Sequence, residues 1–212
     1  MKTTVLTAGG GFLTGLLLLA TSAMAQYGGG TGDPNDPFQI WTPEQMNTIG
    51  AREADWDKSF LLMSDLDMSG ITGTQYHVIG NNERFTGTFD GGGHVIRNLN
   101  FSGMGLFGYT SNATIANLNL ENFQITAKST YAGSLAGSQT NGKIINCSAS
   151  GLLNATGLDI GGLVGHSNGL ISDCHSSGAV TVINRSQSCR GPEVWWASNH
   201  TVPLSEAPVP PA

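Results

Sequence analysis

The second half of the chain alternates short apolar runs with polar turns at a regular spacing. Three segments share a glycine–leucine pattern: GLFG at residues 105–108, GSLAG at 133–137 and GGLVG at 161–165. Their last glycines are 29 and 28 residues apart, and each segment precedes a polar turn and a strand-like run. A fixed period of this kind is typical of repeat architectures. We take the recurring glycines as the positions where the chain turns tightly: Gly105, Gly108, Gly133, Gly137, Gly162 and Gly165.

Aligning the three units produces columns of like residues. Within each unit, side chains after the first column alternate with period two, which is the pattern of a half-buried strand. The alternation predicts that Leu118, Cys147 and Cys174 face inward. It predicts that the residues that follow them face outward. The columns are Ile115, Ile144 and Ile171; Asn117, Asn146 and Asp173; Leu118, Cys147 and Cys174; and Asn119, Ser148 and His175.

A unit of about 28 residues cannot close a hydrophobic core alone, but units stacked about 4.8 Å apart can share one. We therefore predict an all-β protein, a parallel β-helix or solenoid, over residues 59–183. The composition agrees, since 30 glycines disfavour helical bundles and a charged fraction of 11% disfavours a disordered chain. A sandwich of hairpins is the competing all-β fold. It would show short turns about every 8–12 residues rather than a repeat of about 28 residues.

The region before the repeats predicts further strands and a cap. The runs at 60–68 and 84–101 are typical of strands and turns. Thr42, Pro43 and Gln45 have the N-cap, first-turn proline and capping-box positions of a helix, which we place at 43–49. Because an open solenoid end exposes unpaired strands, we assign residues 26–58 as a cap that contains this short helix.

The first 25 residues have the features of a secretory signal peptide. Lys2 precedes the apolar run 12–20, and the small residues at 23 and 25 place the predicted cleavage between Ala25 and Gln26. We expect a secreted or cell-surface protein with no membrane span in the mature chain. The net charge of −6 argues against a nucleic-acid partner, which requires a basic face.

Five motifs together resemble bacterial secreted proteins with the GLUG motif, named for Gly-Leu-x-Gly. They are DPFQIWTPEQMNTIG, FLLMSDLDMSG, FTGTFDGGGHVIRNL, GLFG and GGLVG, and they lie between residues 33 and 182. Such repeats occur in large surface proteins, including stretches of IgA peptidases and haemagglutinin-like adhesins. The resemblance implies a right-handed parallel β-helix in an extracellular protein. It implies no catalytic residue, because the motif is structural.

Several residues suggest chemistry, and each has a structural alternative. Residues 165–169 match G-x-S-x-G around Ser167, but a nucleophile elbow requires a following helix, and a repeat turn is expected here. His166 and His175 flank one turn and could meet Asp173 in a metal site, or they are an exposed polar rung. No pair of histidines has the H-E-x-x-H spacing of a metalloprotease.

Two further groups could contact a ligand. Asp65 and Asp67 lie two residues apart, which would suit calcium or glycoside chemistry if they are not part of an ordinary strand. Four aromatic residues could form a carbohydrate platform, although aromatic residues in a cap more often belong to the core: Trp41, Trp56, Tyr76 and Phe85.

We assign no catalytic, cofactor-binding or metal-binding residue. The favoured hypothesis is a non-catalytic scaffold, spacer or adhesive module whose partner, if any, is a carbohydrate or another surface ligand. The alternatives are a polysaccharide-active β-helix enzyme, a lyase or hydrolase, and a fragment of a larger surface protein.

Cysteine pairing and the C-terminal residues complete the predictions. Cys147 and Cys174 share a column, and adjacent coils would bring their Cα atoms within disulfide range. Because stacked inward side chains are parallel, we favour free thiols. Residues 184–212 contain five of the eight prolines and no G-L-x-G, so we expect a poorly ordered tail. It is either a cap with a linker or the product of a shifted or truncated reading frame.

Overall fold

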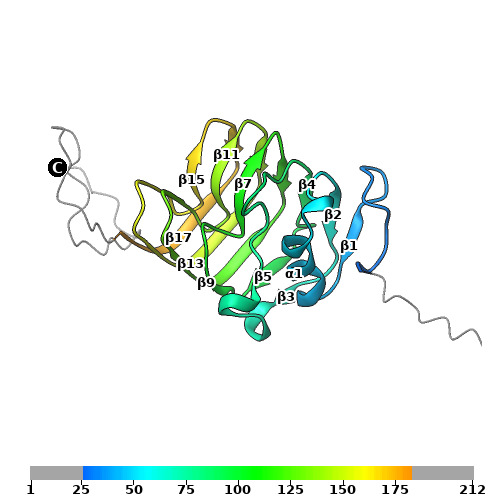
Figure 1. Ribbon diagram of the computed structural model, residues 1–212, viewed down its shortest axis with the longest axis horizontal. Helices are drawn as coiled ribbons and strands as arrows, with labels where there is room; N and C mark the ends of the chain where they lie inside the picture. Colours follow the sequence, from blue (N-terminus) through cyan, green and yellow to red (C-terminus); the bar gives the residue numbers. More distant parts are fainter. Residues whose placement is uncertain (1–25, 183–212) are drawn as a thin grey trace, which may run out of the picture.

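The computed structural model describes residues 26–182, which form a parallel β-solenoid with one short α-helix near the N-terminal end (Figure 1). Every pairing between its strands is parallel. The predicted all-β fold class is confirmed. The predicted signal peptide (1–25, with Ala25) and tail (184–212) lie outside the described residues.

Three faces of the coil carry the sheets. The first sheet has the order β1 (Phe38–Ile40), β2 (Ser59–Leu62), β4 (Thr88–Asp90), β8 (Thr114–Ala116), β12 (Lys143–Ile145) and β16 (Leu170–Ser172). The second has the order β3 (Leu66–Asp67), β5 (Val95–Arg97), β9 (Asn119–Ala127), β13 (Ser148–Ala155) and β17 (His175–Val182), with β6 (Asn100–Ser102) also paired to β9. The third contains β7 (Phe107–Ser111), β11 (Ala136–Thr140) and β15 (Val164–Ser167), and a smaller pair joins β10 (Tyr131–Ala132) to β14 (Asp159–Ile160).

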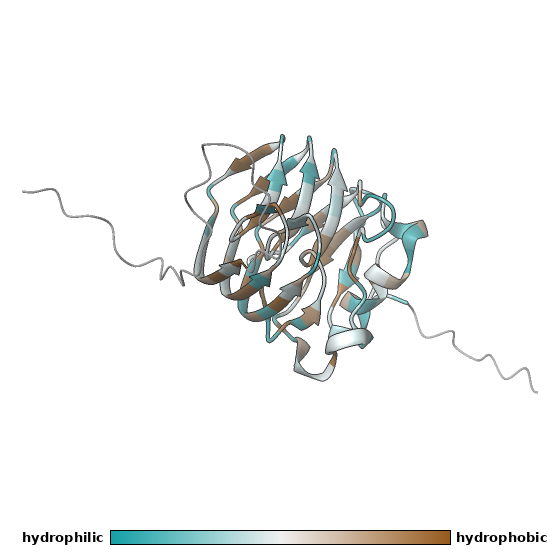
Figure 2. Ribbon diagram, turned by 60° about the vertical axis from the view of Figure 1, so that its left-hand side comes forward, coloured by the Kyte–Doolittle hydropathy of each residue, from teal (hydrophilic) through white to brown (hydrophobic). Residues whose placement is uncertain are grey.

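The register matches the columns read from the sequence. Ile115 lies opposite Ile144, which lies opposite Ile171. The same column continues toward the N-terminus through Phe89, Phe60 and Phe38, where the G-L-x-G pattern is absent. Parallel pairing thus begins at β1, inside the segment 26–58 that the sequence assigns to the cap. In Figure 2, hydrophobic and hydrophilic stretches alternate along each coil.

Helix α1 (Pro43–Ala51) begins as the sequence predicts. The Thr42 side chain accepts a hydrogen bond from the backbone N–H of Gln45, and the Gln45 side chain accepts one from the backbone N–H of Trp41. The helix extends two residues beyond the predicted end. It continues through Gly50, where the missing Cβ lets it lie against the backbone carbonyl of His77. Three 3₁₀ turns follow: η1 (Glu53–Asp55), η2 (Met68–Gly70) and η3 (Gly73–Gln75).

The core is aromatic in the early coils and becomes smaller along the axis. Phe60, Phe85, Phe89 and Phe107 are fully buried, and the ring centroids of Phe85 and Phe107 are 5.2 Å apart. Toward the C-terminal end, the position of Phe107 is taken by Ala136 and then by residue 164, a valine. Ala155 is the last buried residue of the described chain.

Candidate functional site

Polar side chains gather at the corner where the chain leaves the first sheet and enters the second. Asn117, Asn146 and Asp173 occupy this corner in successive coils, with φ angles of 53°, 52° and 54°. Asparagine and aspartate tolerate this left-handed conformation better than other residues with side chains. The predicted column of these three residues is therefore a row of equivalent turns.

Hydrogen bonds join the corner residues from coil to coil. The Asn117 amide donates to a carboxylate oxygen of Asp90 at 3.0 Å, and the Asn146 amide donates to the side-chain oxygen of Asn117 at 2.9 Å. Because a carboxylate only accepts, Asp90 fixes the direction of every amide in this ladder. A second ladder runs along the other end of β5, where Asn98 donates to Asp67 at 2.8 Å and Asn122 donates to Asn98 at 2.6 Å.

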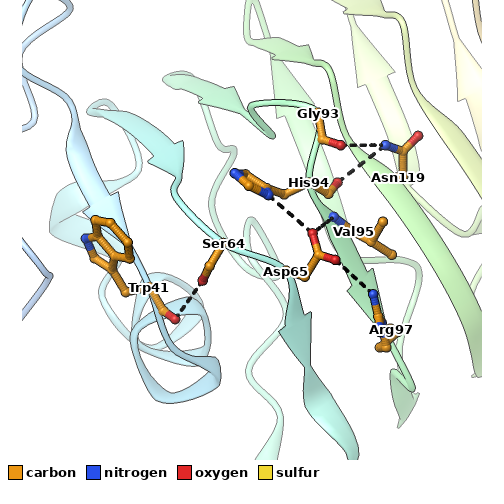
Figure 3. A network of polar contacts seen from close by, with 8 residues as sticks. All are labelled: Trp41, Ser64, Asp65, Gly93, His94, Val95, Arg97 and Asn119. Atoms are coloured by element: carbon orange, nitrogen blue, oxygen red, sulfur yellow. Dashed lines mark hydrogen bonds and ion pairs between the residues drawn. The ribbon is translucent and has the colours of Figure 1, made fainter.

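Asp65 is the centre of a third polar network, drawn in Figure 3. One of its carboxylate oxygens lies 3.2 Å from Nδ1 of His94 and accepts the backbone N–H of Val95 at 3.1 Å. The other accepts from Arg97 at 3.0 Å. The Val95 N–H, followed by the His94 contact, holds the pKa of Asp65 below its usual range. The network ties β3 to β5 and is open to solvent.

Asp67 also has structural partners, so the two carboxylates are not a free pair. Besides the bond from Asn98, Asp67 accepts the backbone N–H of Ser69 at 3.0 Å and caps η2. The Asn98 bond is the main reason that the pKa of Asp67 is lowered. Within residues 26–182, no group of three or more histidine, cysteine or acidic side chains is placed to hold a metal ion.

Ser167 lies in a repeat turn. Its hydroxyl donates to the side-chain oxygen of Gln139 at 2.8 Å and accepts the backbone N–H of Gly169 at 3.2 Å. Strand β16 follows, where a nucleophile elbow would have a helix. The G-x-S-x-G pattern here therefore forms a repeat turn, as the sequence analysis expects.

His166 pairs with a different acid from the one suggested by the sequence. Its Nδ1 lies 3.1 Å from a carboxylate oxygen of Asp159, and its ring lies 5.4 Å from that of Tyr131. The partner of His166 is thus Asp159 rather than Asp173, since Asp159 lies on β14, which contacts β15 within the same coil. His166 therefore helps to close its own coil.

The four candidate aromatic residues separate into two groups. Trp56, Tyr76 and Phe85 are buried, as expected for core residues, whereas Trp41 is 45% exposed. The Trp41 ring packs on Gly28, and the Ser64 hydroxyl donates to the Trp41 carbonyl at 3.0 Å (Figure 3). The four residues do not form one platform.

Three of the six repeat glycines lie inside strands, where the missing Cβ allows close packing, and the other three lie between strands. Gly108, Gly137 and Gly165 lie opposite one another in β7, β11 and β15. A Cβ on Gly137 would lie 2.7 Å from the Cβ of Met104. Before them, Gly105 and Gly162 share a column with Ser134, so Gly133 is one position out of that column.

The alternation predicts that Leu118, Cys147 and Cys174 face inward, and this is confirmed for the first two. Leu118 and Cys147 are buried and Cys174 is half-buried, and both cysteines are free. The Cys174 sulfur accepts from the backbone N–H of Cys147 at 3.4 Å. Burial raises the pKa of the Cys147 thiol to about 12.

Sequence reasoning missed a groove beside the cap. A pocket of about 530 Å³ lies between the end of α1 and the segment 76–82, and a second of about 410 Å³ adjoins it toward the end of β9. Both are lined by Asn81, Ser102 and Gly103, and we call the combined feature the Ser102 groove. Its residues come from distant parts of the chain, so no local motif marks it. Only the aromatic candidates Trp56 and Tyr76 pointed to this region.

Comparison with known proteins identifies the repeats. The family model described as the GLUG motif matches residues 128–156 and 156–183. Halomucin of Haloquadratum walsbyi is 34% identical over 71% of this chain, which spans 2% of the length of halomucin. A solved structure from Bacteroides ovatus, described as a candidate immunoglobulin A1 protease, has 18% identity and a TM-score of 0.35, with 84% of each chain covered.

Among residues 26–182, no helix has both the length and the apolar character needed to cross a membrane. The two motif matches coincide with the coils that contain β10–β13 and β14–β17. The chain therefore carries two adjacent copies of the GLUG motif on a parallel β-solenoid.

Proposed function

We propose that this chain is a non-catalytic β-solenoid module of a secreted or cell-surface protein, where it serves as a scaffold, spacer or adhesive module. One observation carries the proposal: the side chains that could do chemistry hydrogen-bond within or between neighbouring coils. Asp65, Asp67 and Asp90 each accept from the following coil, and Ser167 donates to the preceding one.

The positions of these groups also favour a structural role. Catalytic groups need a concave site that collects substrate and excludes water. The Asp65 network lies on a solvent-exposed corner, and neither pocket of the Ser102 groove is lined by Asp65, Asp67 or Ser167. Residues whose hydrogen bonds join coils in a regular ladder suit a module that must keep its length and shape.

Export is the second part of the proposal. The apolar run before Ala25 and the small residues at the predicted cleavage site support it. The similarity to halomucin, a protein named as a mucin, is compatible with a place outside the cell.

A polysaccharide-degradation screen with the purified full chain tests the non-catalytic role. We expect no release of reducing ends or unsaturated sugars from neutral or acidic polysaccharides. Product formation that is lost in Asp65→Asn, and retained in the matched Asp57→Asn, would establish an enzyme and overturn the proposal. The second substitution changes an exposed aspartate that contacts only the neighbouring Lys58 among its hydrogen-bond partners in residues 26–182.

A fusion to a reporter that folds only after export tests the location. We expect reporter activity from the full chain and none from a chain that starts at Gln26. Equal activity from both would contradict the role of residues 1–25 as an export signal.

A further inference from the structure

We propose that two copies of this chain join end to end, through antiparallel pairing of β17 of one copy with β17 of the other. The site is the open end of the solenoid formed by the last described coil, residues 156–182. The partner is a second copy of the chain, so the pair would form one longer solenoid body. This inference goes beyond the proposed function, because it concerns a partner and holds whether or not the chain is catalytic or exported.

The strand edges at the opposite, N-terminal end of the solenoid are covered. Strand β1 has three residues, and its free side is closed by two backbone bonds: Gly28 donates to the Gln39 carbonyl at 2.8 Å, and Gln39 donates to the Gly29 carbonyl at 2.9 Å. On the third face, Gly108 of β7 donates to the Ile79 carbonyl at 2.7 Å. Strand β3, which begins the second sheet, has only two residues. Short edge strands and covering loops are common protections against pairing with another chain.

The edge formed by β17 has none of these protections within residues 26–182. Strand β17 is the outermost strand of the second sheet, drawn in orange in Figure 1, and it pairs only with β13 in the part of the chain that the structure describes. It runs for eight residues, from His175 to Val182, with no proline, lysine or acidic residue. A long, neutral edge strand with valine and threonine is a template for a further strand.

Open apolar side chains gather at the same end. Among residues 26–182, five large hydrophobic residues are exposed, and three of them belong to the last coil: Leu158, Leu170 and Ile171. Val164 and Val180 pack against the core but are only partly buried. A face that combines unpaired backbone with open apolar side chains gains from being covered, because both the hydrogen bonds and the apolar contacts are then completed.

The backbone of β17 is self-complementary about a two-fold axis at Ala179. The His175 N–H donates to the Cys147 carbonyl at 3.1 Å, so the odd-numbered residues of β17 point their backbone groups toward β13. Because this direction alternates along a strand, the other four point outward: Ser176, Gly178, Val180 and Val182. The axis places Ser176 opposite Val182 of the second copy, and Gly178 opposite Val180. Every free backbone group of β17 then meets another free group.

The side chains agree with the same pairing. Opposite residues in an antiparallel pair have their side chains on the same face of the sheet. Val180 and Val182 therefore remain on the core side, where the matching residues of β13 are buried. On the solvent side, Ser177 lies opposite Thr181, and no two like charges meet within β17. One edge thus supplies both halves of the interface, as a two-fold dimer requires, which favours a second copy over an unrelated protein.

The size of the open end also suits an interface between two copies. The last coil, residues 156–182, is close in length to the roughly 20–30 residues that each partner contributes to a standard interface. Residues 184–212 are a poorer cover for this edge, because five prolines lie in that part of the sequence and a proline cannot donate to a strand ladder.

The first test is sedimentation of the purified full chain from about 0.1 to 100 µM. We expect a monomer–dimer equilibrium with a Kd of about 1–10 µM, at the weak end for an interface of this size. Ala179→Lys should weaken the dimer about fivefold, because two ammonium groups would then lie opposite each other. Leu152→Lys is the matched control, since Leu152 lies in the same column one coil inward and is 47% exposed. It should leave the Kd unchanged. Melting temperatures well below the Kd show that both variants fold.

A cysteine at the two-fold position tests the pairing itself. Opposite residues of a pair without hydrogen bonds have Cα atoms about 4.5 Å apart, within disulfide range. Ala179→Cys, in a Cys189→Ser background, should therefore give a covalent dimer on mild oxidation, whereas Leu152→Cys should not.

Four results would overturn the inference. They are a chain that stays monomeric at 100 µM, a dimer that Ala179→Lys does not weaken, open-ended oligomers, or a dimer that appears only when residues 184–212 are removed. The last result would mean that those residues cover the end themselves. Polysaccharide cleavage or a failure of export would contradict the proposed function alone, so the two failures are distinguishable.

Discussion

The inner coils and the last described coil are built from matching columns but differ in burial. Ile144 is 1% exposed, whereas Ile171, the next residue of its column, is 40% exposed. Its neighbour Leu170 is 51% exposed, and no residue from 156 to 182 is buried. The hydrophobic pattern is therefore the same in both regions, and the difference comes from whether a further coil covers the column.

This comparison shows that the hydrophobic side chains of one coil are buried by the coils on either side of it. Each inner coil is covered on both sides, and the first coils are further covered by α1, which buries Met46 and Ile49. In a stacked fold, the stability of one unit thus depends on the interface with its neighbours. Substitutions at equivalent columns should have effects that depend on their distance from the end.

The largest expected effect is at the isoleucine column. Ile144→Ala should lower the free energy of unfolding by about 2–5 kcal/mol, because it removes buried methyl groups and leaves a cavity. Ile171→Ala should cost well under half as much, since its side chain keeps much of its contact with water. Denaturant unfolding of the two variants measures the difference. Equal costs would show that Ile171 is covered in solution.

The next effect is at the glycines that pack in strands. Gly137→Ala would place a Cβ 2.7 Å from the Cβ of Met104 and 2.9 Å from the Gly108 carbonyl, which should cost about 1–3 kcal/mol. Gly70→Ala is the control, because no atom lies within 4 Å of the added Cβ and no positive φ is required. A neutral effect of Gly137→Ala on the melting temperature would contradict the close approach of these strands.

The hydrogen-bond ladder of Asp90, Asn117 and Asn146 should give the third-largest effect, and the loss of its middle residue should lower the free energy of unfolding by about 2 kcal/mol. Asn117→Ala removes two side-chain hydrogen bonds and leaves a residue with a Cβ at φ 53°. Asn117→Gly keeps the favourable backbone, so it should recover part of the loss. Unfolding measurements on the pair separate backbone strain from hydrogen bonding. Equal stability of the two variants would exclude a contribution from strain.

Most of the stacking was predictable, because it follows from a period and an alternation. The isoleucine, asparagine and cysteine columns are visible along the sequence, and the start of the helix is marked by Thr42 and Pro43. The earlier coils were less clear, since Phe60 and Phe89 replace isoleucine there and no G-L-x-G is present.

What the sequence could not predict depends on contacts between distant segments. The Ser102 groove combines the ends of α1, β6 and β9, and no local spacing encodes it. The role of Gly137 depends on Met104, which lies in another coil. The partner of His166 depends on which side chains of one coil face each other, and the spacing of residues along the chain does not show that Asp159 lies opposite His166.

Burial also differs between the two cysteines, and this difference should appear in their reactivity. Burial raises the pKa of Cys147 to about 12, so at pH 8 its thiol stays protonated and unreactive, whereas Cys174 is half-buried in the last described coil. In the native protein, iodoacetamide should label Cys174 well before Cys147. Mass spectrometry without reductant measures this, and after unfolding both should be labelled. If Cys147 and Cys174 both stay unlabelled after unfolding without reductant, they form a disulfide. Cys189, which we also expect to be labelled, lies outside the described residues.

The smallest effect is expected at Asp65, whose network ties two early coils and is open to water. The Val95 N–H, with His94, lowers the pKa of this carboxyl in the folded chain, so its ionised form stabilises folding above its pKa in the unfolded state, about 3.9. That contribution is lost as the pH falls through the lower folded pKa. Asp65→Asn should therefore be slightly less stable than the original chain at pH 7, and the gap should shrink as the pH falls below about 4. Thermal unfolding across this range measures the gap, with Asp57→Asn as the exposed control. A gap that stays constant with pH would mean that the Asp65 contacts do not favour the charged form.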